Sequence, residues 1–300
     1  MSRLVPPGAE QRHVETPSGR LRVLHAGPGA AGLPPAVLVH GGGSDNAAIS
    51  WYRLIEPLSR EREVWALDLP GFGGSMEAAP AGGPRELAAV LSGALDALAT
   101  GRAVVFGVSM GGDVALNLAL DHARHVAGLV LIAPGGLVPV FRNRTAHFWA
   151  WLSAQSPDRI LLPASRVANR FVRSALRAIV ADPAALPPQV VEEFAREARD
   201  PRGGLAYGRY NQATLGRHRM LNDLTGRVHE IRAPTLFFHG ADDPIVDPEG
   251  SRRAAARMPR ARLVVAPGCG HWAQLEAHER FLAEAEAFLT GLDAGPAAEG

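Results

Sequence analysis

The hydrophobic positions of this chain fall into two kinds of segment. Short runs in which almost every residue is apolar have the length of buried strands, whereas longer stretches repeat apolar residues every three or four positions, as helices do. The predicted strands are 35–40, 63–69, 103–106, 126–133, 235–239 and 262–266, and the predicted helices are 84–100, 110–123, 248–258 and 273–289. Buried strands that alternate with helices are typical of a mostly parallel sheet with helices on both faces, so the pattern predicts an α/β fold.

The segment 136–232 interrupts this alternation. It contains no clear buried strand, and five prolines, at positions 163, 183, 187, 188 and 201, divide it into short helical stretches. Because the segment begins where one predicted strand ends and stops just before the next, we interpret it as a helical cap inserted over the carboxyl edge of the sheet. The core then consists of 1–135 and 233–300, and within it 291–300 is predicted to be a flexible tail.

The amino-acid composition excludes several classes of function. The 300 residues carry 31 cationic and 30 acidic side chains, and every cation is an arginine. Without lysine the chain can form no Schiff base and has no P-loop lysine for phosphates. The balanced charge gives no field for a polyanion, so nucleic acid is not an expected partner. A single cysteine excludes an internal disulfide.

The chain also lacks the signals of membrane and export proteins. The first dozen residues contain no apolar run of the secretory kind, and no apolar stretch approaches the roughly 20 residues that cross a bilayer. We therefore expect a soluble, cytoplasmic protein that acts on a small molecule without membrane contact. A homodimer is left open.

The strongest chemical signal is the sequence GVSMGG at 107–112, between a predicted strand and a predicted helix. A sharp strand-to-helix turn presents a serine hydroxyl in a strained backbone conformation, and small residues on either side avoid a clash. The helix that starts at Met110 offers free N–H groups to a developing negative charge. In this context Ser109 is a candidate nucleophile.

Four further segments follow the order of a known family. They are HGGG at 40–43, DLPGFGGS at 68–75, GADDPIV at 240–246 and GCGHW at 268–272, each at the carboxyl end of a predicted strand. With GVSMGG they make the chain resemble the α/β-hydrolases, over about 13–289, in the branch that uses a serine nucleophile. The resemblance implies a triad in the order Ser…Asp…His, with His271 as the base. By position after Gly240, Asp243 is the better match for the acid and Asp242 is the alternative.

The same resemblance implies an oxyanion hole made of backbone N–H groups. One comes from Met110, the residue after the nucleophile, and the other from the glycine loop, where Gly42 is the first choice and Gly43 the second. His40 is interpreted as a structural histidine that bonds the loop backbone. Asp247 is interpreted as the cap of the helix that follows it.

The segment GCGHWAQLE at 268–276 is closely similar to the meta-cleavage product hydrolases, which cleave a C–C bond in vinylogous diketones. A tryptophan directly after the histidine is typical of them, and they bind a carboxylate with a cap arginine. The resemblance thus implies Trp272 and Arg196 as substrate-binding residues. Two differences from these hydrolases favour a less specific prediction, a hydrolase of carboxylic esters or of C–C bonds. Val108 stands where asparagine is usual, and Ser44-Asp45-Asn46 replaces a Gly-Pro-Gly type of run.

Aromatic residues near the start of the cap, including Phe148 and Trp151, either pack the cap on the core or line an apolar substrate pocket. The sequence therefore predicts a serine hydrolase for a carboxylic ester or a vinylogous diketone. The alternatives are a slow or non-hydrolytic small-molecule receptor of the same fold and a pathway acyltransferase or cyclase. No HExxH metal motif and no GxGxxG nucleotide motif is present, so we expect neither a metal nor another cofactor.

Overall fold

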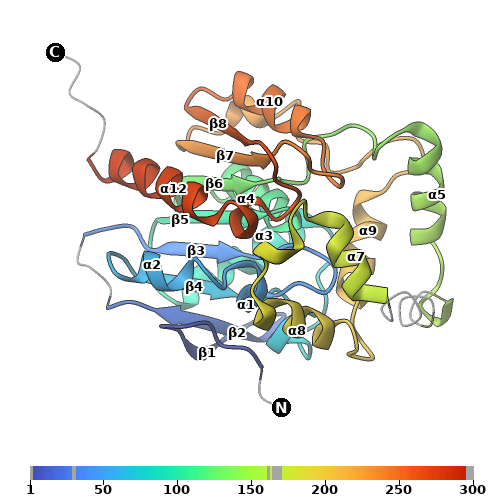
Figure 1. Ribbon diagram of the computed structural model, residues 1–300, viewed down its shortest axis with the longest axis horizontal. Coiled ribbons are helices and arrows are strands. Elements are labelled where there is room, and N and C mark those ends of the chain that lie inside the picture. Colours follow the sequence, from blue (N-terminus) through green and yellow to red (C-terminus); the bar gives the residue numbers. More distant parts are fainter. Residues whose placement is uncertain (1–2, 29–31, 161–162, 164–170, 295–300) are drawn as a thin grey trace.

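An eight-stranded sheet forms the centre of the computed structural model, which describes residues 3–28, 32–160, 163 and 171–294 (Figure 1). The strands are β1 Glu10–Thr16, β2 Gly19–Ala26, β3 Ala36–Val39, β4 Val64–Leu67, β5 Ala103–Val108, β6 Val126–Ile132, β7 Thr235–Gly240 and β8 Ala261–Ala266. Their spatial order is β1-β2-β4-β3-β5-β6-β7-β8, with β2 antiparallel to both of its neighbours and the six strands from β4 to β8 parallel. The predicted α/β fold is confirmed, and each of the six predicted strands belongs to the sheet.

The antiparallel hairpin of β1 and β2 was not predicted from the sequence. Only Val14 is buried in β1, which lies at the edge of the sheet, so this strand carries no apolar run. The buried stretch of β2 includes Arg22 and His25, and these polar residues interrupt the apolar pattern that would indicate a buried strand. Both side chains find partners, since Arg22 pairs with Asp68 and His25 lies between two glutamates.

Helices cover both faces of the sheet. Alternate residues of β5 point to opposite sides, with Val105 in one apolar core and Val104 and Phe106 in the other. The first core is covered by α3 Pro84–Ala97, α4 Met110–Asp121 and α10 Pro248–Arg257, and the second by α1 Ala47–Ser50, α2 Ile55–Ser59, α11 Ala273–Glu276 and α12 His278–Asp293. Short 3₁₀ turns occur at η1 Gly73–Ser75, η2 Ala123–His125, η4 Pro183–Ala185 and η5 Val228–Glu230.

The insertion between β6 and β7 contains helices joined by loops, with one isolated antiparallel bridge between Leu215 and Met220. It contains α5 Arg144–Ala154, α7 Val172–Ile179, α8 Pro188–Glu197 and α9 Leu205–Thr214, which lie beyond the carboxyl ends of the parallel strands (Figure 1). Leu176 and Val190 of this cap pack against Ile49, Trp272 and Leu275 of the core. This apolar contact attaches the cap to the edge of the sheet where the chemistry-bearing loops emerge.

The C-terminal helices differ from the prediction in two ways. The predicted helix 273–289 is two helices, because the chain bends at Ala277 between α11 and α12. Helix α12 continues to Asp293, whose carboxylate pairs with the buried Arg62 at 2.6 Å, so 291–293 belong to the core rather than to a tail. The last six residues of the predicted tail, 295–300, lie outside the described residues.

Candidate active site

Ser109 occupies the turn between β5 and α4 in a backbone conformation that side chains rarely adopt. Its φ is +53° and its ψ is −117°, and its carbonyl oxygen accepts hydrogen bonds from the N–H groups of Gly112 and Gly135. The flanking glycines make the turn feasible. A Cβ on Gly107 would lie 2.4 Å from the Gly111 carbonyl oxygen, and a Cβ on Gly111 would lie 2.3 Å from the Val39 carbonyl oxygen. The fold therefore maintains a strained serine, a feature that clusters at functional sites.

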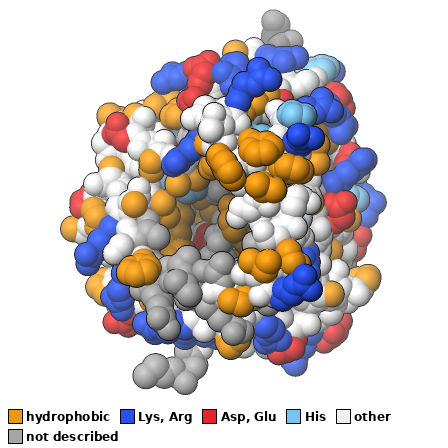
Figure 2. All heavy atoms as spheres, turned by 90° about the vertical axis from the view of Figure 1, so that its right-hand side faces the viewer, with side chains coloured by type: hydrophobic (Ala, Val, Ile, Leu, Met, Phe, Trp, Pro, Cys, Tyr) orange, Lys and Arg blue, Asp and Glu red, His pale blue; other side chains and the backbone are white. Residues whose placement is uncertain are grey.

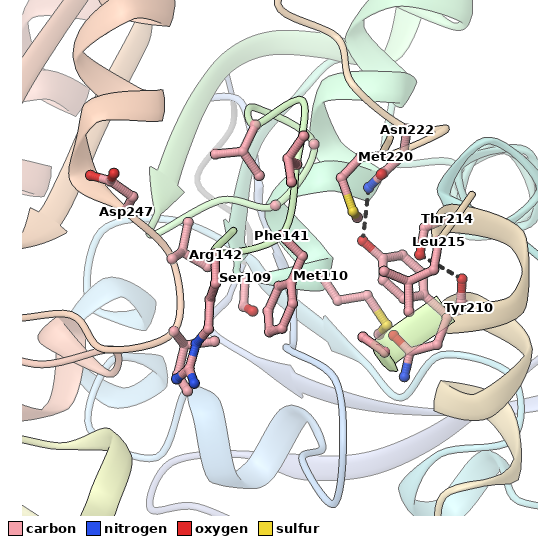
Figure 3. Close-up of a pocket in the computed structure, with 18 of the residues that line it drawn as sticks. Ser109, Met110, Phe141, Arg142, Tyr210, Thr214, Leu215, Met220, Asn222 and Asp247 are labelled. Atoms are coloured by element: carbon pink, nitrogen blue, oxygen red, sulfur yellow. Dashed lines mark hydrogen bonds between the residues drawn. The ribbon is translucent and has the colours of Figure 1, made fainter. Parts of the chain in front are cut away.

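A cavity of about 680 Å³ opens beside this serine. Figure 2 shows the face of the molecule that carries the cap, hollowed near its centre and rimmed with hydrophobic side chains. In the view of Figure 3, Ser109 is drawn between Arg142 and Phe141, and all three residues line the cavity. Apolar lining side chains come from the loop after β6, from the cap and from the loop after β7, among them Val138, Phe141, Leu215, Met220 and Ile245. Polar and charged side chains also line the cavity, among them Arg142, Asn211 and Arg253. Such a site suits a small molecule with an apolar portion and polar groups.

Asp243 and His271, the acid and base expected from the sequence, lie within hydrogen-bonding distance of each other. The Nδ1 atom of His271, in the loop after β8, lies 2.8 Å from Oδ2 of Asp243, in the loop after β7. The other carboxylate oxygen, Oδ1, accepts the N–H groups of Ile245 and Val246 at 2.8 and 3.0 Å. Asp242, the alternative acid, is exposed and pairs with no histidine among the described residues.

The environment of Asp243 keeps it ionised. Burial by itself raises the pKa of Asp243, but hydrogen bonds from His239 and His271 outweigh burial and hold the pKa well below its usual range. A permanently charged carboxylate at Nδ1 orients the ring so that Nε2 is the nitrogen available to a nucleophile. In the described part of the chain, no hydrogen bond joins Nε2 to the Ser109 hydroxyl. Catalytic hydrogen bonds of this kind often tighten only when substrate binds.

The glycine loop beside Ser109 is held by buried polar groups. Oδ2 of Asp45 accepts the N–H of Gly41 at 2.8 Å, and the same carboxylate also binds the N–H of Asn46 and the hydroxyl of Ser50. His40 bonds the loop backbone as predicted, because its Nε2 accepts the N–H of Leu69 and its Nδ1 therefore donates to the Gly41 carbonyl. Asp45 thus supports this loop in the place of the Gly-Pro-Gly type of run.

Within this loop the Gly41 N–H is already used, which leaves Gly42 and Gly43 as candidate oxyanion donors. Gly42 lies under the ring of Tyr207 from α9, and a Cβ there would be 2.2 Å from a ring carbon. Gly43 has a positive φ of 76° and open space around its Cβ position. The Tyr207 ring of the cap lies so close that only a glycine fits at position 42, whether or not Gly42 takes part in catalysis.

A buried polar network between the cap and α4 was not anticipated from the sequence. Asp113, one turn after Ser109, accepts hydrogen bonds from the Tyr210 hydroxyl and from the side-chain amides of Asn117 and Asn222. Burial raises the pKa of Asp113 to about 7, although the hydrogen bonds from its partners lower it. The only sequence signal was a charged residue on the otherwise apolar face of a helix.

None of the four residues suggested for substrate binding lines the cavity beside Ser109. Helix α5 turns Ala150 and Ala154 toward it, whereas Phe148 packs on Trp149 and Trp151. Trp272 is buried against Phe194 in the contact between cap and core. These placements revise the expectation for the three aromatic residues, because packing of the cap on the core and on itself accounts for their contacts.

Arg196 also has partners of its own. Its Nε donates to Glu193 at 2.8 Å and its Nη2 donates to Glu197 at 2.7 Å, while Arg3 pairs with Glu197 from the other side. Arg196 is absent from the lining of the cavity beside Ser109. Its guanidinium is neutralised by two buried carboxylates, so no excess positive charge remains there for a substrate carboxylate.

Two features of the described residues bear on other classes of protein. No group of three or more histidine, cysteine, aspartate or glutamate side chains in 3–28, 32–160, 163 and 171–294 has the arrangement to hold a metal ion. Among the described helices, none combines the length and the apolar character needed to cross a membrane.

Comparison with known proteins places the chain in a family. Residues 34–278 match the family described as alpha/beta hydrolase fold. The 2-hydroxymuconate semialdehyde hydrolase of Pseudomonas sp. (strain CF600) is 32% identical over 87% of this chain and 88% of its own length. The dihydrolipoyllysine-residue acetyltransferase component of an acetoin cleaving system from Pseudomonas putida is also 32% identical, over 87% of this chain and 65% of its own length.

Solved structures agree on the fold. A thermophilic esterase from Thermogutta terrifontis superimposes with a TM-score of 0.74 at 25% identity, covering 95% of this chain and 100% of that one. A mutant of a meta-cleavage product hydrolase superimposes with a TM-score of 0.73 at 22% identity, covering 93% and 98% of the two chains. The chain belongs to the α/β-hydrolase fold family and is an α/β-fold hydrolase.

Proposed function

We propose that the protein is a serine hydrolase in which Ser109, His271 and Asp243 act as nucleophile, base and acid. The observation that carries the proposal is the buried Asp243–His271 pair on the same sheet edge as a serine held at φ +53°. The neutral imidazole takes the proton of the Ser109 hydroxyl as the oxygen attacks a carbonyl carbon. Asp243 stabilises the imidazolium that results.

The charge that develops on the carbonyl oxygen needs hydrogen-bond donors. We assign this role to the backbone N–H groups of Met110, at the start of α4, and Gly42, with Gly43 as the alternative to Gly42. Loss of one such donor typically costs about 3–4 kcal/mol of transition-state stabilisation. Collapse of the intermediate expels the leaving group, which takes the proton from His271, and water then hydrolyses the acyl-enzyme by the same route. Every step uses side chains or backbone groups of the chain, so we expect no cofactor.

The substrate is proposed to be a small carbonyl compound with an apolar portion, either a carboxylic ester or a vinylogous diketone whose C–C bond is cleaved. The lining of the cavity, apolar in part and polar in part, is compatible with either class. The names of several relatives that are about 30% identical favour the second, including hydrolases of 2-hydroxymuconate semialdehyde and of 2-hydroxy-6-oxo-2,4-heptadienoate.

The first experiment identifies the nucleophile. A fluorophosphonate probe should label the wild type on Ser109 alone, as mapped by mass spectrometry, and should not label Ser109→Ala. The labelled enzyme should be inactive. An adduct on any other residue would refute the assignment, and a wild type that turns over no faster than Ser109→Ala while still binding ligand would point to a receptor.

The second experiment defines the reaction. Steady-state rates for a ring-cleavage dienoate and for p-nitrophenyl esters of increasing chain length should show which bond is cleaved and whether the cavity prefers apolar acyl groups. A series of esters with equal kcat/KM would contradict an apolar acyl site. The acetyltransferase among the relatives favours acyl transfer as a second candidate. Products formed with an added alcohol or amine acceptor distinguish transfer from hydrolysis.

The choice of acid is tested by a pair of neighbouring variants. Asp243→Asn removes the charge at Nδ1 of His271 and should lower kcat by roughly 10³- to 10⁴-fold, the size of effect known for this substitution in serine triads. Asp242→Asn changes an exposed carboxylate and should leave kcat within about twofold of the wild type. The reverse pattern would transfer the role of acid to Asp242.

A further inference from the structure

A second histidine contacts the carboxylate of Asp243. His239 is the penultimate residue of β7, and its ring is completely buried. Its Nε2 lies 3.2 Å from Oδ2 of Asp243, the same oxygen that faces His271, and 3.0 Å from the carbonyl oxygen of Val246. Its Nδ1 lies 2.9 Å from the hydroxyl of Ser251 on α10. The ring therefore lies between the loop that carries Asp243 and helix α10, which contributes no residue to the proposed triad.

These partners define which nitrogen of His239 carries hydrogen. Both neighbours of Nε2, a carboxylate and a carbonyl, can only accept, so Nε2 must donate. The hydroxyl of Ser251 hydrogen-bonds Nδ1 on the opposite side of the ring. The ring therefore directs its Nε2–H toward Asp243 and Val246, and Ser251 helps to hold it in this orientation.

We propose that His239 is a positioning residue for catalysis, which holds the Asp243 carboxylate in the orientation that presents Oδ2 to His271. This inference rests on the proposed function of the triad. The backbone N–H groups of Ile245 and Val246 hold Oδ1, and His239 and His271 share Oδ2 from two sides. With four donors around one buried carboxylate, neither rotation nor protonation of Asp243 is easy.

Removal of His239 has two consequences. The carboxylate loses the donor that opposes its rotation, so the His271 ring is held less firmly and kcat falls. The charge on Oδ2, no longer shared with His239, then interacts with His271 alone and stabilises the imidazolium more strongly. Because the base must be neutral to accept the serine proton, the acid limb of the kcat/KM profile moves to higher pH.

The experiment compares four variants of the full chain. His239→Leu removes the donor at similar volume, and His239→Gln restores an amide N–H near the position of Nε2. Ser251→Ala removes the hydrogen-bond partner of Nδ1. Phe237→Leu is the matched packing control, because Phe237 is equally buried on the same strand and belongs to the apolar core that α3, α4 and α10 cover. Each variant is measured for kcat, KM, the pH profile of kcat/KM and the melting temperature.

We expect His239→Leu to lower kcat about 10- to 100-fold, the range known for removal of groups that orient metal ligands, with little change in KM. Its acid limb should move to higher pH, His239→Gln should recover most of both effects, and Ser251→Ala should fall between His239→Leu and the wild type. Phe237→Leu should lower only the melting temperature. A folded His239→Leu variant with unchanged kcat and an unchanged acid limb would overturn the proposal, as would a loss that His239→Gln does not reverse.

One further measurement separates this inference from the proposed function. The proton between Asp243 and His271 should give a low-field resonance in the proton NMR spectrum, which does not depend on turnover. A shift of this resonance in His239→Leu but not in Phe237→Leu would support the positioning role even if no substrate is found. An identical resonance in both variants would contradict it. Failure of Ser109→Ala to reduce activity, in contrast, would count against the proposed function alone.

Discussion

The hydroxyl of Tyr210 on cap helix α9 donates a 2.6 Å hydrogen bond to the carboxylate of Asp113, one turn beyond Ser109 on α4. The contact joins two segments that are 97 residues apart and is completely buried. Asn222 from the cap and Asn117 from α4 bond the same carboxylate. The cap is thus attached to the helix that carries the nucleophile by polar contacts as well as by apolar packing.

We expect Tyr210→Phe to lower the free energy of unfolding by about 1–3 kcal/mol, because the buried carboxylate of Asp113 loses a donor. Tyr207→Phe is the matched control. Tyr207 stacks on Tyr210 at a centroid distance of 5.9 Å, yet its hydroxyl makes no hydrogen bond within the described part of the chain. Urea denaturation of both variants measures the difference. Equal stabilities would mean that the Tyr210 hydroxyl contributes nothing beyond its ring.

The same network predicts a dependence of stability on pH. The pKa of Asp113 is raised to about 7 in the folded protein from an ordinary value of 3.8, so between these values the folded chain binds more protons than the unfolded chain. Stability from this group is complete below pH 4 and falls by about 1.4 kcal/mol per pH unit as the pH rises toward 7. Asp113→Asn removes the titration.

Measurement of the free energy of unfolding at pH 5, 6, 7 and 8 tests whether stability falls as the pH rises. Burial also raises the pKa of Glu197 to about 7, although Arg3 and Arg196 lower it, so the wild type contains a second group with the same direction. The difference between wild type and Asp113→Asn isolates the contribution of Asp113. We expect Asp113→Asn to gain stability relative to the wild type as the pH rises from 5 to 7. A difference that is constant across this range would show that Asp113 does not titrate there.

The parts of the site that could be predicted from the sequence are those encoded locally. The Ser109 turn depends on the small residues around it, and Asp243 precedes two N–H groups that bond its own carboxylate. The contacts of His239, Asp113 and Tyr210 depend instead on how distant segments pack, so no local pattern marks them. Phe148 and Trp151 illustrate the same limit, since the sequence indicates an aromatic cluster but tertiary packing decides which side of α5 faces the cavity.

The glycine at position 42 gives a prediction about the oxyanion loop. In Gly42→Ala the new Cβ would meet the Tyr207 ring at 2.2 Å, and that ring is itself stacked on Tyr210, so the loop must move. We expect kcat to fall about 10²-fold or more, the size of effect that follows loss of an oxyanion donor. Gly82→Ala, where a Cβ meets nothing within 4 Å, should leave kcat unchanged.

A second substitution tests the cause of that loss. Tyr207→Ala in the Gly42→Ala background makes room for the methyl group and should recover part of kcat. If the double variant is no better than Gly42→Ala, the collision with Tyr207 is not the reason for the defect. If Gly42→Ala keeps the wild-type kcat, Gly42 does not supply the oxyanion donor and the role passes to Gly43.

The ion pairs of Arg196 lead to a prediction that separates folding from recognition. Arg196→Met would remove the guanidinium beside Glu193 and leave Glu197 paired with Arg3 alone. Both carboxylates are nearly inaccessible to solvent, so the substitution should lower the free energy of unfolding by about 3–5 kcal/mol at pH 8. The loss should be smaller at pH 6, where these carboxylates can take up protons. Arg199→Met removes the same charge from an exposed position in the segment after α8 and should change the free energy of unfolding little.

The ratio of KM for a dienoate carboxylate to KM for a neutral ester should be unchanged in Arg196→Met, because the guanidinium is already neutralised. A rise in KM confined to the dienoate would instead identify Arg196 as the ligand of the substrate carboxylate.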